Sequence, residues 1–155
     1  MASSSDAKTR TRVHIGRTFN EIGSDSKLNL DGRWVSTTSA DRPDLDALVY
    51  DVATGDELSR LTHQSGVAAV SVRRDGRWIA TGAYDNVARV FEDGKQLSQR
   101  PHKDFVVDVE FSPDGRYVAT ASFDRTARLF EADTGKEIWQ LSHGGRVLSV
   151  AFSPD

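Results

Sequence analysis

The chain repeats its own sequence at a fixed interval, and this feature restricts its possible folds more than any other. Positions 111–124 read FSPDGRYVATASFD, and positions 72–85 read VRRDGRWIATGAYD, 39 residues earlier. A weaker copy begins at Leu28, and a fourth opens at Phe152. A period of about 40 residues indicates a repeat architecture in which one structural unit is used several times. Residue types that recur once per unit are therefore candidates for structural roles.

Histidine and aspartate recur in the same register as the copies. In each long copy the Asp of an Asp-Gly pair precedes a second Asp by ten residues, in the pairs Asp31 and Asp41, Asp75 and Asp85, and Asp114 and Asp124. A histidine lies nine residues before the start of a copy at His63, His102 and His143. The His63–Asp85 and His102–Asp124 separations are both 22 residues. These equal spacings define one register for all the units.

Each unit contains four short runs of β-branched and aromatic residues, which predict strands. In the second unit the runs cover 67–72, 78–81, 86–91 and 96–100, and in the third 106–111, 117–120, 125–130 and 137–141. An Asp-Gly pair between the first two runs predicts a hairpin turn. No segment has the apolar spacing of a long amphipathic helix. We therefore predict an all-β fold of four-stranded antiparallel units, the pattern of a β-propeller blade.

These features resemble the WD-repeat β-propeller family. The resemblance covers residues 20–155 and is carried by the His-containing segments at 61–63 and 141–143, the FSPDG turn at 111–115, the ATASFD segment at 119–124 and the aromatic-acid pair after the third run. It implies an incomplete ring of three full blades with flanking strands. The implied blades are 20–62, 63–101 and 102–142, and residues 143–155 begin a further blade.

The resemblance also implies a structural role for the recurring His and Asp. In the family, Asp, His, Ser and Trp of one blade form a hydrogen-bonded tetrad. The Trp position is occupied here by Tyr50, Phe91 and Phe130, and the Ser position by Ser39, Ala83 and Ser122. None of these aromatic rings has an indole N–H. We therefore expect the tetrad to be reduced to His-Asp pairs and the blades to be less stable, with the pair residues at His63, Asp85, His102, Asp124 and His143.

Three His and three Asp also invite a catalytic or metal-binding interpretation. The period, however, places each His on a separate blade beside its own Asp, so the groups do not converge on one ion. The chain has no Cys, and no nucleophile elbow is present. A buried carboxylate that accepts a hydrogen bond from an imidazole explains the pattern. We predict no catalytic residue, no metal and no cofactor.

Composition is that of a globular domain. Hydrophobic residues make up 37% of the chain and charged residues 28%, and no apolar run approaches the roughly 20 residues of a membrane span. The first residues lack the apolar core of a secretory signal. The absence of Cys favours a cytoplasmic location. The net charge of −3, with acids and bases interleaved, predicts no nucleic-acid partner and no membrane partner.

The two ends of the chain bear on ring closure. Residues 1–11 are rich in Ser and charge and predict a flexible tail. Residues 12–19 read as a lone strand that closes the ring against the last blade. Rings usually contain four to eight blades, more than this chain supplies. We therefore expect either a fragment of a longer propeller or self-association of two chains through open blade edges.

Function follows from the resemblance and from residues that differ between equivalent loops. The family implies a non-catalytic scaffold that binds other proteins. Aromatic residues and Arg on an exposed rigid face are typical of binding hot spots. The partner-binding candidates on the loop face are Tyr84, Phe105, Phe123, Arg146 and Lys103. The alternative for Tyr84 and Phe123 is that they only cover the adjoining blade.

Two other functions remain open at this point. The blades can be the sensor or interaction region of a larger multidomain signalling enzyme. A quinoprotein-like propeller enzyme is the third alternative, because TGKEIW at 134–139 is similar to its blade motif. That match occurs once, whereas the His-Asp pattern recurs. The scaffold is therefore the leading hypothesis.

Overall fold

The computed structural model describes residues 27–28, 33–38 and 46–155. These residues form three antiparallel sheets of four strands each. The first sheet contains β1 (Lys27–Leu28), β2 (Trp34–Thr38), β3 (Asp46–Asp51) and β4 (Glu57–Thr62). The second contains β5 (Val67–Val72), β6 (Trp78–Ala83), β7 (Val87–Glu92) and β8 (Lys95–Pro101). The third contains β9 (Val106–Phe111), β10 (Tyr117–Ser122), β11 (Thr126–Glu131) and β12 (Glu137–Ser142).

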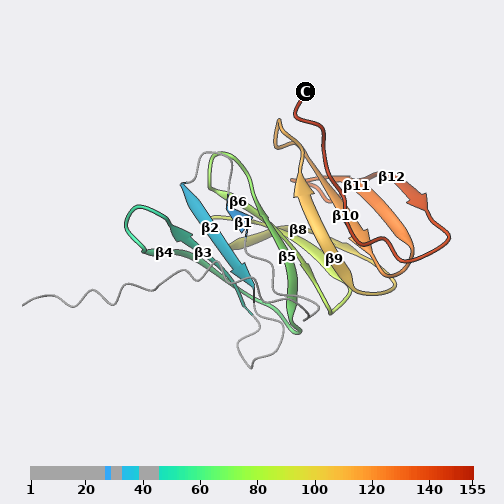
Figure 1. The fold of residues 1–155 in the computed structure, drawn as a ribbon, viewed down its shortest axis with the longest axis horizontal. Coiled ribbons are helices and arrows are strands. Elements are labelled where there is room, and N and C mark those ends of the chain that lie inside the picture. Colours follow the sequence, from blue (N-terminus) through green and yellow to red (C-terminus); the bar gives the residue numbers. More distant parts are fainter. Residues whose placement is uncertain (1–26, 29–32, 39–45) are drawn as a thin grey trace, which may run out of the picture.

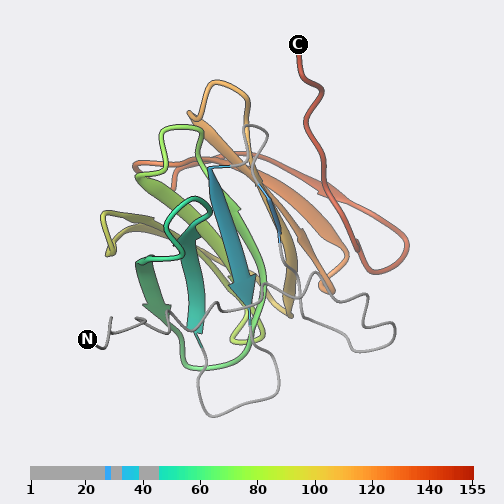
Figure 2. The same ribbon diagram turned by 60° about the vertical axis from the view of Figure 1, so that its left-hand side comes forward.

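The sheets stand side by side as successive blades (Figure 1). Within each sheet the strands follow one another in chain order, and β5 lies between β2 and β9. The prediction of an all-β fold with four-stranded blades is confirmed. The described part of the chain forms no closed ring (Figure 2). The expected tail at 1–11 and closing strand at 12–19 lie outside the described residues.

The hairpin turns explain the recurring Asp-Gly pair. Gly76 and Gly115 have φ angles of 76° and 72°, a left-handed conformation that glycine adopts without strain. The Gly115 N–H donates to Ser112 O at 2.8 Å, which closes the turn between β9 and β10. A side chain at Gly115 would also collide with Arg73 of the neighbouring sheet. The turn therefore needs glycine for its own conformation and for packing between blades.

The core lies between the sheets. One buried cluster joins the first two sheets and includes Val49, Leu61, Val67, Ile79 and Phe91. A second cluster joins the second and third sheets and includes Val90, Val109, Val118 and Phe130. The aromatic residue that closes the third strand of a unit thus fills the space between blades. Burial of one such side chain contributes about 1.5–3 kcal/mol.

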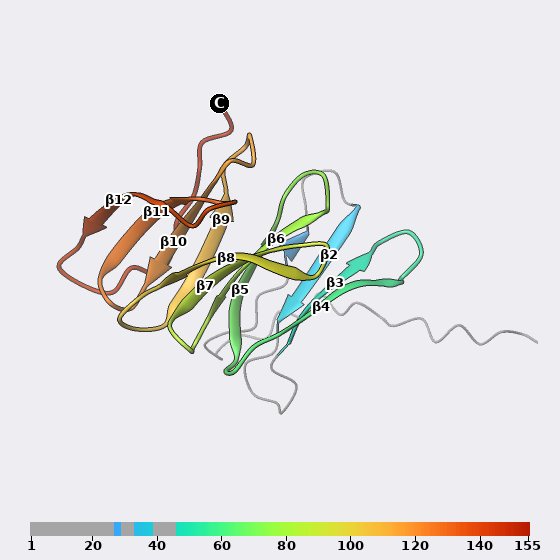
Figure 3. The same cartoon turned by 180° about the vertical axis from the view of Figure 1, so that it is seen from behind.

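The segment after β12 follows the inner edge of the third sheet (Figure 3). The Val150 N–H donates to Asp108 Oδ2 at 3.0 Å, and the Phe152 N–H donates to Glu110 Oε2 at 2.7 Å. Residues 143–155 contain no strand, although the repeat places the first strand of a further blade there. A strand forms only in a ladder with a partner strand, and within the described residues the N–H groups of Val150 and Phe152 have side-chain acceptors instead.

The third sheet leaves apolar side chains uncovered. Leu141 is 54% exposed, whereas Leu61, at the equivalent position of the first sheet, is 1% exposed. The second sheet covers Leu61 within the buried cluster between the first two sheets. Trp139 on the same strand as Leu141 is 39% exposed. None of the described residues forms a helix that is long and apolar enough to cross a membrane.

Candidate functional site

Loops of the second and third sheets gather at one end of the molecule. Because neighbouring strands are antiparallel, the connections β6–β7, β8–β9 and β10–β11 all lie at the end opposite the Asp-Gly turns. The Tyr84 N–H donates to Gly66 O at 2.9 Å, and the Phe123 N–H donates to Phe105 O at 3.0 Å. These equivalent hydrogen bonds give the loops of the two blades the same conformation. They place the predicted loop residues on one face.

Four of the predicted partner-binding residues are in contact with one another. The ring centroids of Tyr84 and Phe105 are 4.9 Å apart, and those of Phe105 and Phe123 are 6.0 Å apart. The guanidinium of Arg146 lies 4.6 Å from the centroid of the Phe123 ring. We call these four residues the aromatic row. The row continues from the second blade across the third to the segment that follows it.

The aromatic row is accessible from solvent. The Phe105 side chain is 39% exposed, Arg146 is exposed, and Tyr84 and Phe123 are half-buried. Tyr84 and Phe123 therefore contact the adjoining loop and also keep open surface. Lys103 is exposed but has no ring contact in this part of the structure. Its backbone N–H donates to Asp124 Oδ2 at 3.0 Å, which connects its loop to the buried polar network below.

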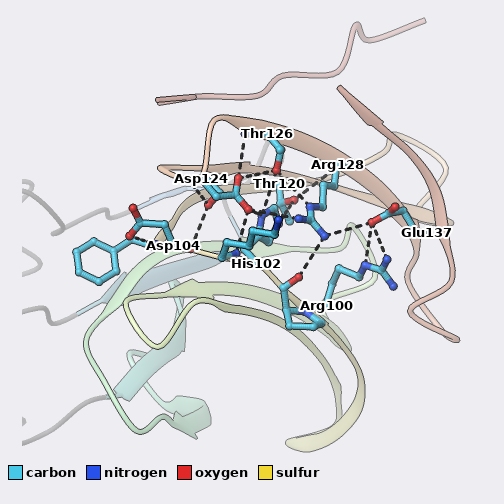
Figure 4. A network of polar contacts seen from close by, with 12 residues as sticks. Arg100, His102, Asp104, Thr120, Asp124, Thr126, Arg128 and Glu137 are labelled. Carbon is cyan, nitrogen blue, oxygen red and sulfur yellow. Dashed lines mark hydrogen bonds and ion pairs between the residues drawn. The ribbon is translucent and has the colours of Figure 1, made fainter. Parts of the chain in front are cut away.

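That network is centred on His102 and Asp124 (Figure 4). His102 Nδ1 lies 3.0 Å from Asp124 Oδ2, and His102 Nε2 lies 2.9 Å from Thr120 Oγ1. The Thr126 hydroxyl donates to Asp124 Oδ1 at 2.6 Å, and the Thr126 N–H donates to the same oxygen at 2.9 Å. The third blade therefore has a larger network than the bare His-Asp pair that we expected.

The protonation states of this network follow from burial and hydrogen bonding. Burial of the His102 ring, together with the nearby Arg128 cation, lowers its pKa, so the ring is neutral at pH 7. Burial alone would raise the pKa of Asp124, but hydrogen bonds from Thr126, Lys103 N–H and His102 hold it far below its usual range. A neutral His102 therefore donates from Nδ1 to the ionised carboxylate and accepts at Nε2 from the Thr120 hydroxyl.

An ion-pair chain joins the network to the second blade (Figure 4). Arg128 Nη2 lies 3.3 Å from Asp124 Oδ2, and Arg128 Nη1 lies 3.4 Å from Glu137 Oε2. Glu137 Oε2 also accepts from Arg100 Nη2 at 2.6 Å. Since Arg100 belongs to β8 and Glu137 to β12, the chain links the outer strands of two blades.

The second blade does not contain the predicted His-Asp hydrogen bond. His63 Nδ1 lies 2.9 Å from Leu61 O, and His63 Nε2 lies 2.8 Å from Thr81 Oγ1, so both ring nitrogens have other partners. The Asp85 carboxylate instead contacts Arg89 Nη1 at 2.8 Å. Arg128 of the third blade is equivalent to Arg89, and it also pairs with Glu137. The second blade has Gln96 at the position of Glu137. Because Glu137 shares Arg128, Asp124 also accepts a hydrogen bond from His102. Asp85 pairs with Arg89 instead, and His63 bonds to other groups.

The hydroxyl that contacts each histidine is not the one at the Ser position of the family tetrad. Ser122 donates to Asp104 O at 3.0 Å and accepts from the Asp124 N–H at 3.1 Å. The partner of His102 is Thr120, two residues earlier on the same strand. Thr81 and Thr120 are separated by the same 39 residues as the two copies, so this recurring Thr was a signal in the sequence. What recurs between the blades is a His-Thr hydrogen bond.

His143, the third recurring histidine, is exposed. Its backbone N–H donates to Arg125 O at 2.8 Å, as the His102 N–H donates to Asn86 O at 2.7 Å. The equivalent backbone bond shows that the repeat register continues after β12. An Asp at the equivalent spacing from His143 would fall beyond Asp155.

The two histidines inside the blades make structural hydrogen bonds. The two buried histidines are held between hydroxyl, carbonyl or carboxylate partners, and neither is open to a substrate. Within the part of the chain that the structure describes, no three His, Cys, Asp or Glu side chains are placed to hold a metal ion. The accessible chemistry lies in the aromatic row, which offers ring surface and one stacked cation.

Comparison with known families agrees with this arrangement. Residues 55–92 and 94–131 match the family model described as WD domain, G-beta repeat. No curated protein matches the chain significantly. Each matched segment includes one recurring histidine and the Asp that follows it by 22 residues. The two matches and the successive four-stranded antiparallel blades together identify the chain as a member of the WD-repeat β-propeller family.

Proposed function

We propose that this chain is a non-catalytic scaffold that binds partner proteins through the aromatic row. WD-repeat domains in general mediate protein–protein interactions and rarely catalyse reactions. The observation that carries the proposal is the contact of Tyr84, Phe105, Phe123 and Arg146 in one partly exposed row. These residues come from separate loops, so their convergence depends on the fold.

The row has the properties of a binding hot spot. Aromatic side chains offer large contact areas and lose little conformational entropy on binding. The loop that carries Phe105 is held in place, because the Lys103 N–H donates to Asp124 and Ser122 donates to Asp104 O. The buried His102 network therefore serves the proposed function indirectly, as the rigid support of the loop. A preorganised loop reduces the entropic cost of binding.

Partner capture by row variants tests the proposal. Tyr84→Ala combined with Phe123→Ala is expected to abolish capture of partner proteins and to leave the β-sheet circular dichroism spectrum unchanged. Leu97→Ala is the matched control, since Leu97 is as exposed as Phe105 but lies on β8, outside the row. Unchanged capture by the double variant rejects the proposal.

Three further features complete this proposal. A cytoplasmic location is supported by the absence of Cys. Binding to protein rather than to nucleic acid is supported by the net charge of −3. Self-association through the open face of the third sheet is supported by the exposure of Leu141 and Trp139.

A further inference from the structure

The aromatic row lies in a locally basic setting although the chain as a whole carries a net charge of −3. In the described loops around it, Lys103, Arg125 and Arg146 are exposed. The acids of the same loops are engaged internally. Asp85 contacts Arg89, Asp124 accepts from His102 and Arg128, and the Asp104 carboxylate accepts from the Phe105 N–H at 2.8 Å.

Arg146, the cation at the end of the row, is positioned to bind an anion. The Arg146 guanidinium stacks on the Phe123 ring at 4.6 Å and makes no ion pair with any described residue. The N–H groups of a guanidinium in such a cation–π contact remain available to donate, and a pair of them matches the two oxygens of a carboxylate. Since the stacking already restricts the side chain, less entropy is lost when the anion binds.

The remainder of the row offers adjacent apolar surfaces. Successive ring centroids lie 4.9 and 6.0 Å apart, and the Arg146 guanidinium lies 4.6 Å from the centroid of the last ring. An extended polyproline-type chain rises about 3.1 Å per residue, so neighbouring rings are spaced to contact peptide residues about two positions apart. Aromatic-lined surfaces of this kind suit proline and other apolar residues of an extended peptide.

We propose that the aromatic row binds an extended peptide in which proline or another apolar residue is followed by an acidic residue. The apolar part lies on Tyr84 and Phe105, and the carboxylate binds the Arg146 guanidinium beside Phe123. This inference rests on the proposed function, because it specifies the partner of the same surface. Charge complementarity with the exposed cations favours an acidic segment over a basic or neutral one.

Selection from a displayed library of random dodecapeptides tests the inference, with the whole chain as bait. We expect enriched peptides to carry Asp or Glu after Pro or an apolar residue. Phe123→Ala and Arg146→Gln are each expected to weaken these peptides about ten-fold or more. Arg116→Gln is the matched control and is expected to change nothing, because Arg116 also lies over an aromatic ring, that of Tyr117, but at the opposite end of the blade.

A coupling measurement then assigns the acid to Arg146. Replacement of the acidic residue of a selected peptide by its amide is expected to weaken binding to the unaltered chain about ten-fold. The same replacement is expected to have little further effect on the Arg146→Gln variant, since the two changes remove one interaction. Unchanged circular dichroism and melting curves for each variant show that the fold is retained.

The outcomes separate this inference from the proposed function. Peptides that depend on Phe123 but lack an acidic residue, or are insensitive to Arg146→Gln, overturn the inference and leave the scaffold function standing. Failure to select any Phe123-dependent peptide overturns the inference, and the scaffold function is then decided by partner capture with the Tyr84→Ala and Phe123→Ala double variant. Binding of only the phosphoserine form of a selected peptide, with the glutamate form inactive, overturns the carboxylate assignment.

Discussion

The His102 imidazole and the Asp124 carboxylate form a buried hydrogen bond of 3.0 Å, with 0% and 2% of their side-chain surfaces exposed. The lowered pKa of His102 makes this a neutral ring that donates to an ionised carboxylate. The same carboxylate accepts from Lys103 N–H, in the loop that carries Phe105. One buried pair therefore connects blade stability to the geometry of the aromatic row.

Removal of the histidine tests this connection. His102→Ala leaves the buried Asp124 carboxylate without one of its donors and is expected to lower the free energy of unfolding by roughly 1–3 kcal/mol. Chemical denaturation measures the change. His143→Ala is the control within the same repeat register, because exposed His143 is expected to contribute less than about 0.5 kcal/mol. Equal stability of both variants would contradict a structural role for the His102 network.

The buried histidines predict a loss of stability in mild acid. Burial lowers the pKa values of both His63 and His102 in the folded chain below the usual value of about 6.5. Above that pH both states are neutral and no penalty exists. As the pH falls below about 6.5, the unfolded chain takes up protons that the folded chain resists, so the free energy of unfolding decreases. Each histidine contributes a slope of at most about 1.4 kcal/mol per pH unit.

Urea denaturation across a pH series measures this slope. A variant with His63→Gln and His102→Gln is expected to show a flatter dependence between about pH 7 and pH 5. The low pKa of Asp124 acts in the same direction, but its contribution is lost only at more acidic pH, below the ordinary carboxyl range. An unchanged slope in the double variant would show that other groups control the acid response.

Substitution of two glycines with similar backbone conformations distinguishes the cost of a packing clash from the cost of backbone strain. Gly94 and Gly115 have φ angles of 79° and 72°, but a Cβ at Gly94 meets open space and one at Gly115 collides with Arg73. Gly94→Ala is expected to destabilise by about 1 kcal/mol through backbone strain alone. Gly115→Ala is expected to cost about 1 kcal/mol more, because the Arg73 side chain must also shift from its place over the Trp78 ring. Thermal melting distinguishes the two, and equal costs would exclude the packing contribution.

Self-association through the third sheet predicts an oligomer that is sensitive to charge. We expect light scattering to show a dimer whose population rises with concentration. Leu141→Glu places a charge on the exposed apolar face and is expected to shift the chain to monomer. Leu97→Glu, on the outer strand of the second sheet where Leu97 is 40% exposed, is the control. A concentration-independent monomer for the unaltered chain would reject self-association.

Much of the fold could be predicted from sequence because its signals are local. The run at 106–111 coincides with β9, and the run at 125–130 overlaps β11 with its start one residue early, since alternation of apolar residues and turn glycines acts within one strand and its hairpin. The placement of the loop residues of the aromatic row on one face was also expected from their register. Their contact distances were not, because these depend on how far apart two blades stand.

The hydrogen-bonding partners of the histidines illustrate the boundary between sequence and tertiary structure. By itself the sequence determined the period, the strands, the turn glycines and the positions of His63 and His102 within their units. The tertiary structure decided that His63 bonds to Leu61 O and that His102 bonds to Asp124. The physical reason is competition at short range: Asp124 binds His102 as well as Arg128 because Glu137 also pairs with Arg128, whereas Asp85 pairs with Arg89. Those neighbours lie on other strands: Glu137 reaches Arg128 from the next strand, and Arg100 reaches Glu137 from the neighbouring blade, 37 residues away in sequence.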